Sequence, residues 1–221
     1  MRKIPFVLAI LLAAALSLPA TGLAQDLAIG VKGGLAITDL DVDAADPADE
    51  VDTETSTGLV GGAFLTIGLG ERFFVQPEVL YSQKGAEFSD PVEGFTAELE
   101  LDYIEVPVLF GVRFPLVGSP IEPRIFAGPA VAFEASCDVS GDEGGVSVNL
   151  DCDEFGIDTK STDFGVLGGA GVNIGVGGFD IVLDARYVLG LADLDDTTGS
   201  EDDVKNRAFQ FMGGVAFPLG L

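Results

Sequence analysis

Residues 103–114 alternate regularly between apolar positions and polar or small positions. Every second position from Ile104 to Phe114 is apolar, whereas the positions between them include Glu105 and Arg113. Successive side chains of a β-strand point to opposite faces, so this period of two predicts a strand with one apolar face and one mixed polar face. The apolar face would meet a second sheet in a soluble sandwich, and it would meet lipid in a membrane barrel.

The same alternation recurs along the chain in segments of about ten residues, the length that a tilted membrane-spanning strand needs. The eight segments are 27–37, 59–69, 73–84, 103–114, 124–135, 163–174, 179–191 and 207–219. An even number of antiparallel strands places both ends of the chain on the same side of the barrel.

The connections between these segments alternate between short and long. Short connections surround Gly70, Pro115 to Pro123 and Gly175 to Gly178, whereas residues 38–57, 87–100, 137–162 and 192–206 form long connections. The long connections are rich in acid: the first carries eight acidic residues between Asp39 and Glu54 and no basic residue. The pattern predicts an all-β fold, an eight-stranded antiparallel up-and-down transmembrane β-barrel with short periplasmic turns and long acidic extracellular loops. A soluble, lipocalin-like ligand carrier is the alternative.

The first 24 residues have the organisation of a secretory signal peptide. Arg2 and Lys3 precede an apolar run over residues 6–18, and the small-x-small site 22–24 stands before Gln25. The apolar run is shorter than the roughly 20 residues of a spanning helix, which disfavours an uncleaved anchor. We therefore predict a signal peptide over residues 1–24 and one outer-membrane β-barrel domain over residues 25–221.

Export bears on the state of the two cysteines, and the net charge bears on the partners that the mature protein can bind. Cys137 and Cys152 are the two cysteines of an exported chain, so a disulfide within the third long loop is predicted, with two reduced thiols as the alternative. The net charge of −25 excludes nucleic acid as a natural partner and disfavours anionic lipid surfaces.

Three runs of sequence carry a resemblance to a known family. They are V-Q-P-E-V-L-Y-S-Q-K-G over residues 75–85, Y-I-E-V-P-V-L over 103–109, and D-A-R-Y over 184–187 followed by Gly190 and Leu191. In this order they resemble the outer-membrane β-barrel family that includes the PorT-like and OmpX-like eight-stranded barrels of Bacteroidetes-type bacteria. The resemblance covers essentially the whole mature chain. It implies a barrel that contacts outer-membrane lipid and the barrel-assembly machinery. A role in protein secretion belongs to only some members and is not carried over.

One feature departs from the outer-membrane pattern. Such barrels usually end on an aromatic residue that is recognised during assembly, whereas four residues, 218–221, follow Phe217 here.

The polar faces of the predicted strands carry charges of both signs. The predicted lumen residues are Glu78, Lys84, Glu105, Arg113, Arg124, Glu134, Asp184 and Arg186, together with Lys32 and Asp180. An eight-stranded barrel is just wide enough for side chains to fill it, so we interpret these residues as a buried, paired network. A narrow ion path is the alternative, since ionisable residues at membrane depth are often functional.

Enzymatic activity is not expected, and no catalytic residue is predicted. The chain has no histidine, which removes Ser-His-Asp arrangements and the commonest general base. No Gly-rich phosphate-binding loop followed by Gly-Lys-Ser/Thr occurs either.

No cofactor is predicted, apart from weakly bound Ca²⁺ at the acidic loops. Asp39, Asp41 and Asp43 have the 1, 3, 5 spacing of an EF-hand loop with Glu50 at position 12, but position 6 is Ala44 rather than glycine. Solvated surface charge is the alternative interpretation.

The predicted function is a non-enzymatic structural or surface-interaction role, in which the acidic loops meet divalent cations, surface polymers or a partner. A transport or secretion component is the alternative.

Overall fold

The computed structural model describes residues 27–42, 56–90, 95–143, 146–151, 162–191 and 204–220. The described secondary structure consists of strands: β1 (Leu27–Val42), β2 (Ser56–Leu69), β3 (Phe73–Asp90), β4 (Phe95–Arg113), β5 (Ile121–Glu143), β6 (Val146–Asp151), β7 (Thr162–Gly175), β8 (Asp180–Gly190) and β9 (Val204–Leu219). Within these ranges, no helix is long and apolar enough to cross a membrane.

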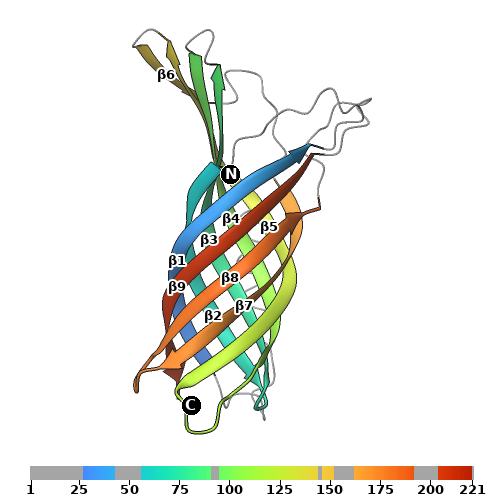
Figure 1. Ribbon diagram of the computed structural model, residues 1–221, viewed down its shortest axis with the longest axis vertical. Coiled ribbons are helices and arrows are strands. Elements are labelled where there is room, and N and C mark those ends of the chain that lie inside the picture. The colour runs from blue at the N-terminus through green and yellow to red at the C-terminus, as the bar shows by residue number, and fades with distance from the viewer. Residues whose placement is uncertain are drawn as a thin grey trace, which may run out of the picture.

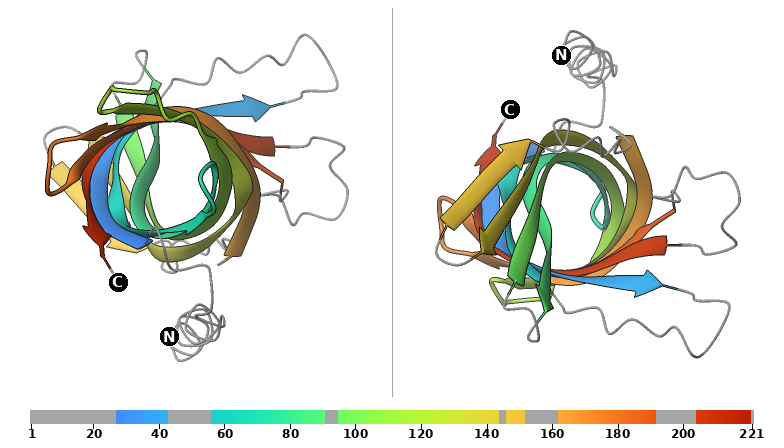
Figure 2. Two further views of the ribbon diagram at one scale, coloured as in Figure 1. Left: turned by 90° about the horizontal axis from the view of Figure 1, so that it is seen from below. Right: turned by 90° about the horizontal axis from the view of Figure 1, so that it is seen from above.

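Eight of these strands close into an antiparallel barrel (Figure 1). Around the barrel the order is β1, β2, β3, β4, β5, β7, β8 and β9, and the pairing of β9 with β1 completes the ring that Figure 2 shows from both ends. The prediction of an eight-stranded up-and-down barrel is confirmed. The described turns at one end are the short ones, each with a glycine in the left-handed region: Gly70 (φ 73°), Gly118 (φ 76°) and Gly177 (φ 96°).

The boundaries predicted at the other end are wrong, because much of the sequence assigned to long loops is strand. β3 continues to Asp90 and β4 begins at Phe95, so residues 87–90 and 95–100 are paired strand rather than loop. β5 continues to Glu143 and pairs there with the additional strand β6, which projects above the barrel in Figure 1. The period of two does persist here, for example from Phe95 to Leu101. This stretch was predicted to be a loop because acidic residues occupy its polar positions.

The two faces of the barrel wall have opposite chemistry, as the alternation predicts. Large apolar side chains are exposed on the outside, among them Val31 at 57%, Phe110 at 56% and Phe209 at 54% relative exposure. The interior holds fully buried polar residues such as Gln76 beside apolar residues such as Leu80. This arrangement is the reverse of a soluble carrier, which would have a polar outside and an apolar interior.

Three interior phenylalanine rings each lie against a glycine that is directly opposite on the neighbouring strand. The pairs are Phe64 with Gly30, Phe74 with Gly111, and Phe126 with Gly169. A Cβ atom at any of the three glycines would collide with the facing ring. These glycines are therefore needed for the interior to hold its aromatic side chains.

Candidate functional site: a buried polar network in the lumen

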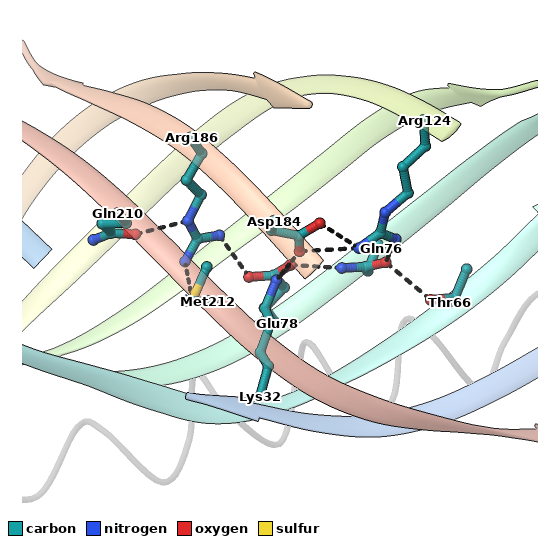
Figure 3. A network of polar contacts seen from close by, with 9 residues as sticks. All are labelled: Lys32, Thr66, Gln76, Glu78, Arg124, Asp184, Arg186, Gln210 and Met212. Carbon is teal, nitrogen blue, oxygen red and sulfur yellow. Dashed lines mark hydrogen bonds and ion pairs between the residues drawn. The ribbon is translucent and has the colours of Figure 1, made fainter. Parts of the chain in front are cut away.

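A connected group of polar side chains fills the middle of the lumen (Figure 3). We call it the lumen network. It is built by six strands, and its members are Lys32, Thr66, Gln76, Glu78, Arg124, Asp184, Arg186, Gln210 and Met212. All of them occupy inward positions of the period-two pattern, which is why strands far apart in sequence can supply one site.

Glu78 on β3 is one of two acidic centres of the network. Lys32 Nζ lies 2.6 Å from Oε1 of this carboxylate, and Gln76 Nε2 donates to the same oxygen at 2.7 Å. Arg186 Nη1 donates to the other oxygen, Oε2, at 2.8 Å. Both carboxylate oxygens are therefore satisfied by charged or amide donors.

Asp184 on β8 is the second acidic centre. Arg124 Nη2 donates to Oδ1 at 2.7 Å and to Oδ2 at 2.9 Å, and Lys32 Nζ donates to Oδ2 at 3.1 Å. Lys32 thus bridges the two carboxylates from β1, and the ion pairs form one continuous system rather than separate contacts.

Amide, hydroxyl and sulfur groups complete the network at its ends. Gln76 Oε1 accepts hydrogen bonds from Arg124 Nη1 and from Thr66 Oγ1, both at 2.9 Å. Arg186 Nε donates to Gln210 Oε1 at 2.7 Å, and Arg186 Nη2 lies 3.4 Å from Met212 Sδ.

Aromatic rings flank two of the cations. The guanidinium carbon of Arg124 lies 5.6 Å from the ring centroids of both Phe74 and Phe126. Lys32 Nζ lies 5.3 Å from the centroid of Phe64. These are the rings that face the interior glycines, and at such distances a ring face attracts a cation.

The ion pairs cross the lumen from wall to wall. β3 and β8 are separated by three strands in either direction around the ring, so the Arg186–Glu78 pair joins opposite sides of the barrel. The five charged side chains are at most 2% exposed. Removing one partner from such a buried pair leaves an uncompensated charge, at a cost of about 3–5 kcal/mol. The network therefore braces opposite walls of the barrel against each other.

The structure brings together half of the ten predicted charges. Glu78, Arg124, Asp184, Arg186 and Lys32 are the charged members of the lumen network, and they lie on the inward face at which the alternation places them.

The remaining predicted charges lie elsewhere. Arg113 is at the short-turn end, 4.0 Å from Glu122, and Asp180 lies at the same end. Glu105 and Glu134 face the lumen further toward the long-connection end. The side chain of Lys84 lies outside the described side chains.

The predicted disulfide and metal site fall largely beyond what the structure describes. Cys137 is buried on β5, whereas Cys152 lies outside the described residues, so their pairing stays a prediction. Of the predicted metal ligands, Asp43 and Glu50 lie outside the described residues, as do the side chains of Asp39 and Asp41. In the described part of the chain, no group of three or more acidic or cysteine residues could hold a metal ion.

Sequence reasoning missed the neutral members of the network. Gln76 lies on the same strand face as Glu78, two residues before it, and Gln210 occupies an inward position of β9. The alternation alone could have identified both, because a fully inward amide in a narrow barrel needs a polar partner.

The sequence and the fold were compared with known protein families and solved structures. Residues 23–196 match the model of a family described as outer membrane protein beta-barrel domain. Solved structures similar to this chain include outer membrane protein W of E. coli, at 12% identity and a TM-score of 0.49, with 90% of this chain and 100% of that chain covered. Neisserial surface protein A (NspA) is similar at 15% identity and a TM-score of 0.45, covering 86% and 97%.

A third similar structure is Ail, the attachment invasion locus protein of Yersinia pestis, at 15% identity and a TM-score of 0.40, covering 86% of this chain and 98% of that chain. A comparison with curated proteins found no match.

Proposed function

The chain belongs to the outer membrane protein beta-barrel domain family and lies in the outer membrane, and from this premise we propose that it is a closed, non-conducting and non-enzymatic barrel with a structural or surface-interaction role. The observation that supports this proposal is the lumen network. An ion that crossed the barrel would have to break the Arg186–Glu78 pair between opposite walls and the bridge that Lys32 makes to both carboxylates.

The energetic cost of opening the network supports a closed resting state. The two carboxylates are fully buried and share three cations, so hydrating the lumen would require several charge-assisted hydrogen bonds to be exchanged at once. Apolar side chains pack on either side of the network, including Phe74 with Leu109 and Phe64 with Val182.

Single-channel recording in planar bilayers tests the closed state. We expect the wild-type protein to give no more current than protein-free bilayers. The double variant Glu78→Ala/Arg186→Ala removes the pair that crosses the lumen, and we expect it to conduct. A matched control, Glu71→Ala/Arg72→Ala, removes the same two charges from the exposed turn between β2 and β3 and should stay closed. A heat-dependent shift in gel mobility would establish that each variant is folded. Steady open-channel current from the wild type would contradict the proposal.

The interaction role is proposed for the acidic connections at the end opposite the short turns, which outer-membrane barrels direct away from the cell. Their acid content favours divalent cations, or surface polymers bridged by such cations, as ligands. Binding of ⁴⁵Ca²⁺ to cells that carry the full chain, compared with cells that carry a variant with the acidic residues between Asp39 and Glu54 replaced by Asn and Gln, tests this role. Equal binding to both would contradict it.

A secretion or transport role is the second candidate, and the resemblance to PorT-like sequence runs favours it. It predicts a secretion partner that co-purifies with the barrel after mild cross-linking of intact cells. Recovery of the barrel alone would weigh against this candidate.

A further inference from the structure

The three short turns, at the lower end of the barrel in Figure 1, differ in their chemistry. Residues 114–120, between β4 and β5, and residues 176–179, between β7 and β8, include no charged residue, whereas the turn between β2 and β3 carries Glu71 and Arg72. We call the two uncharged turns the apolar rim. Short turns of outer-membrane barrels lie on the periplasmic side. We propose that the apolar rim is embedded in the periplasmic leaflet of the membrane, where it contacts phospholipid acyl chains.

Each turn of the apolar rim exposes a valine at its tip. Val117 precedes Gly118 and Val176 precedes Gly177, and both glycines have a left-handed φ at which the chain reverses. Val117 is fully exposed, and Val176 is about half exposed. Other residues of the two turns line the cavity at this end of the lumen, but neither valine does. The valines therefore face the surroundings of the barrel rather than its interior.

The two turns form one surface. β5 and β7 are neighbours in the ring, so the turns that lead into β5 and out of β7 lie next to each other. Gly175 N donates a hydrogen bond to Pro120 O at 2.8 Å, which joins the end of β7 to the β4–β5 turn. The β7–β8 turn is itself closed by a hydrogen bond from Val176 N to Phe179 O at 2.9 Å. The two valine tips are thus held at the same end of one hydrogen-bonded unit.

The apolar rim continues the apolar outer wall of the barrel. Phe114 directly follows β4, Ile121 begins β5, and both side chains are partly exposed like those of the wall above them. The wall ends differently at the β2–β3 turn, where the exposed ring of Phe73 is directly preceded by Arg72. Exposed valine and leucine side chains are unfavourable in water and favourable among acyl chains. The lipid contact of the wall therefore extends over the apolar rim, and it stops at the charged turn.

The charge distribution supports a lipid surface as the partner. The chain has 36 acidic and 11 basic residues, yet none of them lies in the apolar rim. Anionic lipid headgroups repel acidic side chains, so a surface without such side chains can approach the membrane closely. The β2–β3 turn, with its two charges, stays in water. The barrel is consequently seated deeper in the membrane on the side of the apolar rim, because such anchors set the tilt of a membrane protein.

Single tryptophans measure the depth of each turn, because the chain has no tryptophan of its own. Val117→Trp, Glu71→Trp and the wall variant Phe110→Trp are refolded into vesicles of acyl-chain-brominated phosphatidylcholine, with acrylamide on both sides of the membrane as the aqueous quencher. We expect Val117→Trp to be quenched by bromine as Phe110→Trp is, and Glu71→Trp to be quenched by acrylamide instead. The preference of tryptophan for the interface is the same in both turn variants, so it does not explain a difference between them. Heat-dependent gel mobility establishes that each variant is folded.

Two results would overturn the proposal. If acrylamide quenches Val117→Trp as strongly as Glu71→Trp, the apolar rim faces water. If neither quencher reaches Val117→Trp, another protein chain covers the rim, and in vesicles that hold this chain alone that chain is a second copy.

A second set of variants tests whether the valines hold the rim in the leaflet. Val176→Trp reports the depth of the β7–β8 turn, and adding Val117→Asp places a charge on the neighbouring tip. We expect Val176→Trp/Val117→Asp to lose bromine quenching and gain acrylamide quenching relative to Val176→Trp. Adding Arg72→Asp instead, on the charged turn, should change neither. Unchanged quenching in Val176→Trp/Val117→Asp would contradict the proposal.

Discussion

Replacing Glu78 by glutamine tests how much the lumen network stabilises the barrel. The substitution keeps the shape of the side chain and removes one negative charge from a group of three cations and two carboxylates. Asp184, which Lys32 and Arg124 contact, would then be the remaining carboxylate of the network, and Arg186 would lose its charged partner. Breaking a buried ion pair by removing one partner costs about 3–5 kcal/mol, and we expect a loss of this size in the free energy of unfolding.

The measurement is urea unfolding of the protein inserted in lipid vesicles. The chain has no tryptophan, so the folded fraction is followed by the heat-dependent shift in gel mobility and by far-UV circular dichroism. Glu71→Gln makes the same chemical change on an exposed turn and should alter the free energy of unfolding by less than about 0.5 kcal/mol.

The free energy of unfolding of a double variant distinguishes a coupled network from a set of independent contacts. Glu78→Gln/Arg186→Gln removes one charge of each sign, so it should cost less than the sum of the two single variants by at least about 1 kcal/mol. If Glu78→Gln itself costs less than about 1 kcal/mol, as surface ion pairs do, Glu78 is hydrated and the description of a closed, braced lumen is wrong.

Three other predictions concern backbone packing, the cysteines and calcium. Gly171→Ala should destabilise the barrel by about 1–3 kcal/mol or more, because its Cβ would collide with Asp184, whereas Gly213→Ala on the outer face should be tolerated; equal urea midpoints for the two variants would contradict this reasoning. Cys152 directly follows Asp151, which lies opposite Asp138, so a register continued by one residue would bring it to Cys137; we expect non-reducing gels of the wild type to differ in mobility from reducing gels, and Cys137→Ser to abolish the difference. If the acidic connections bind calcium, millimolar Ca²⁺ should raise the melting temperature, and an unchanged melting temperature with both calcium and salt would remove the support for a stabilising ion site.

Which side chains point into the barrel could be predicted from the sequence. The odd or even position of a residue along its strand decides this, whereas its hydrophobicity does not. Leu109 and Phe110 are adjacent and both strongly apolar, yet Leu109 is fully buried in the lumen and Phe110 is 56% exposed on the outer face. The period of two predicted the correct side for each residue, because successive side chains of a strand point to opposite faces.

The partners within the lumen could not be predicted in the same way. Glu78 and Arg186 are 108 residues apart, and their contact depends on the diameter and stagger of the closed ring. Local sequence fixes that each charge points inward, but several pairings of the same charges satisfy that condition. For this reason Arg113, predicted as part of the same set, lies instead at the short-turn end with Glu122.

The phenylalanine–glycine pairs of the interior have a consequence for how the strands find one another during assembly. A slip by one residue is opposed everywhere, because it turns apolar side chains inward and polar ones outward. A slip by two residues keeps the faces correct and is not opposed by that pattern. It would, however, place Phe74 opposite Leu109 or Arg113 instead of Gly111, where the ring has no room.

Such pairs occur between β1 and β2, between β3 and β4, and between β5 and β7, so three of the four hairpins at the end opposite the short turns carry one. In each of these hairpins, the phenylalanine ring fits only in the register that places it opposite the glycine. The acidic connections at this end therefore need not align the strands, because the alignment is encoded inside the wall.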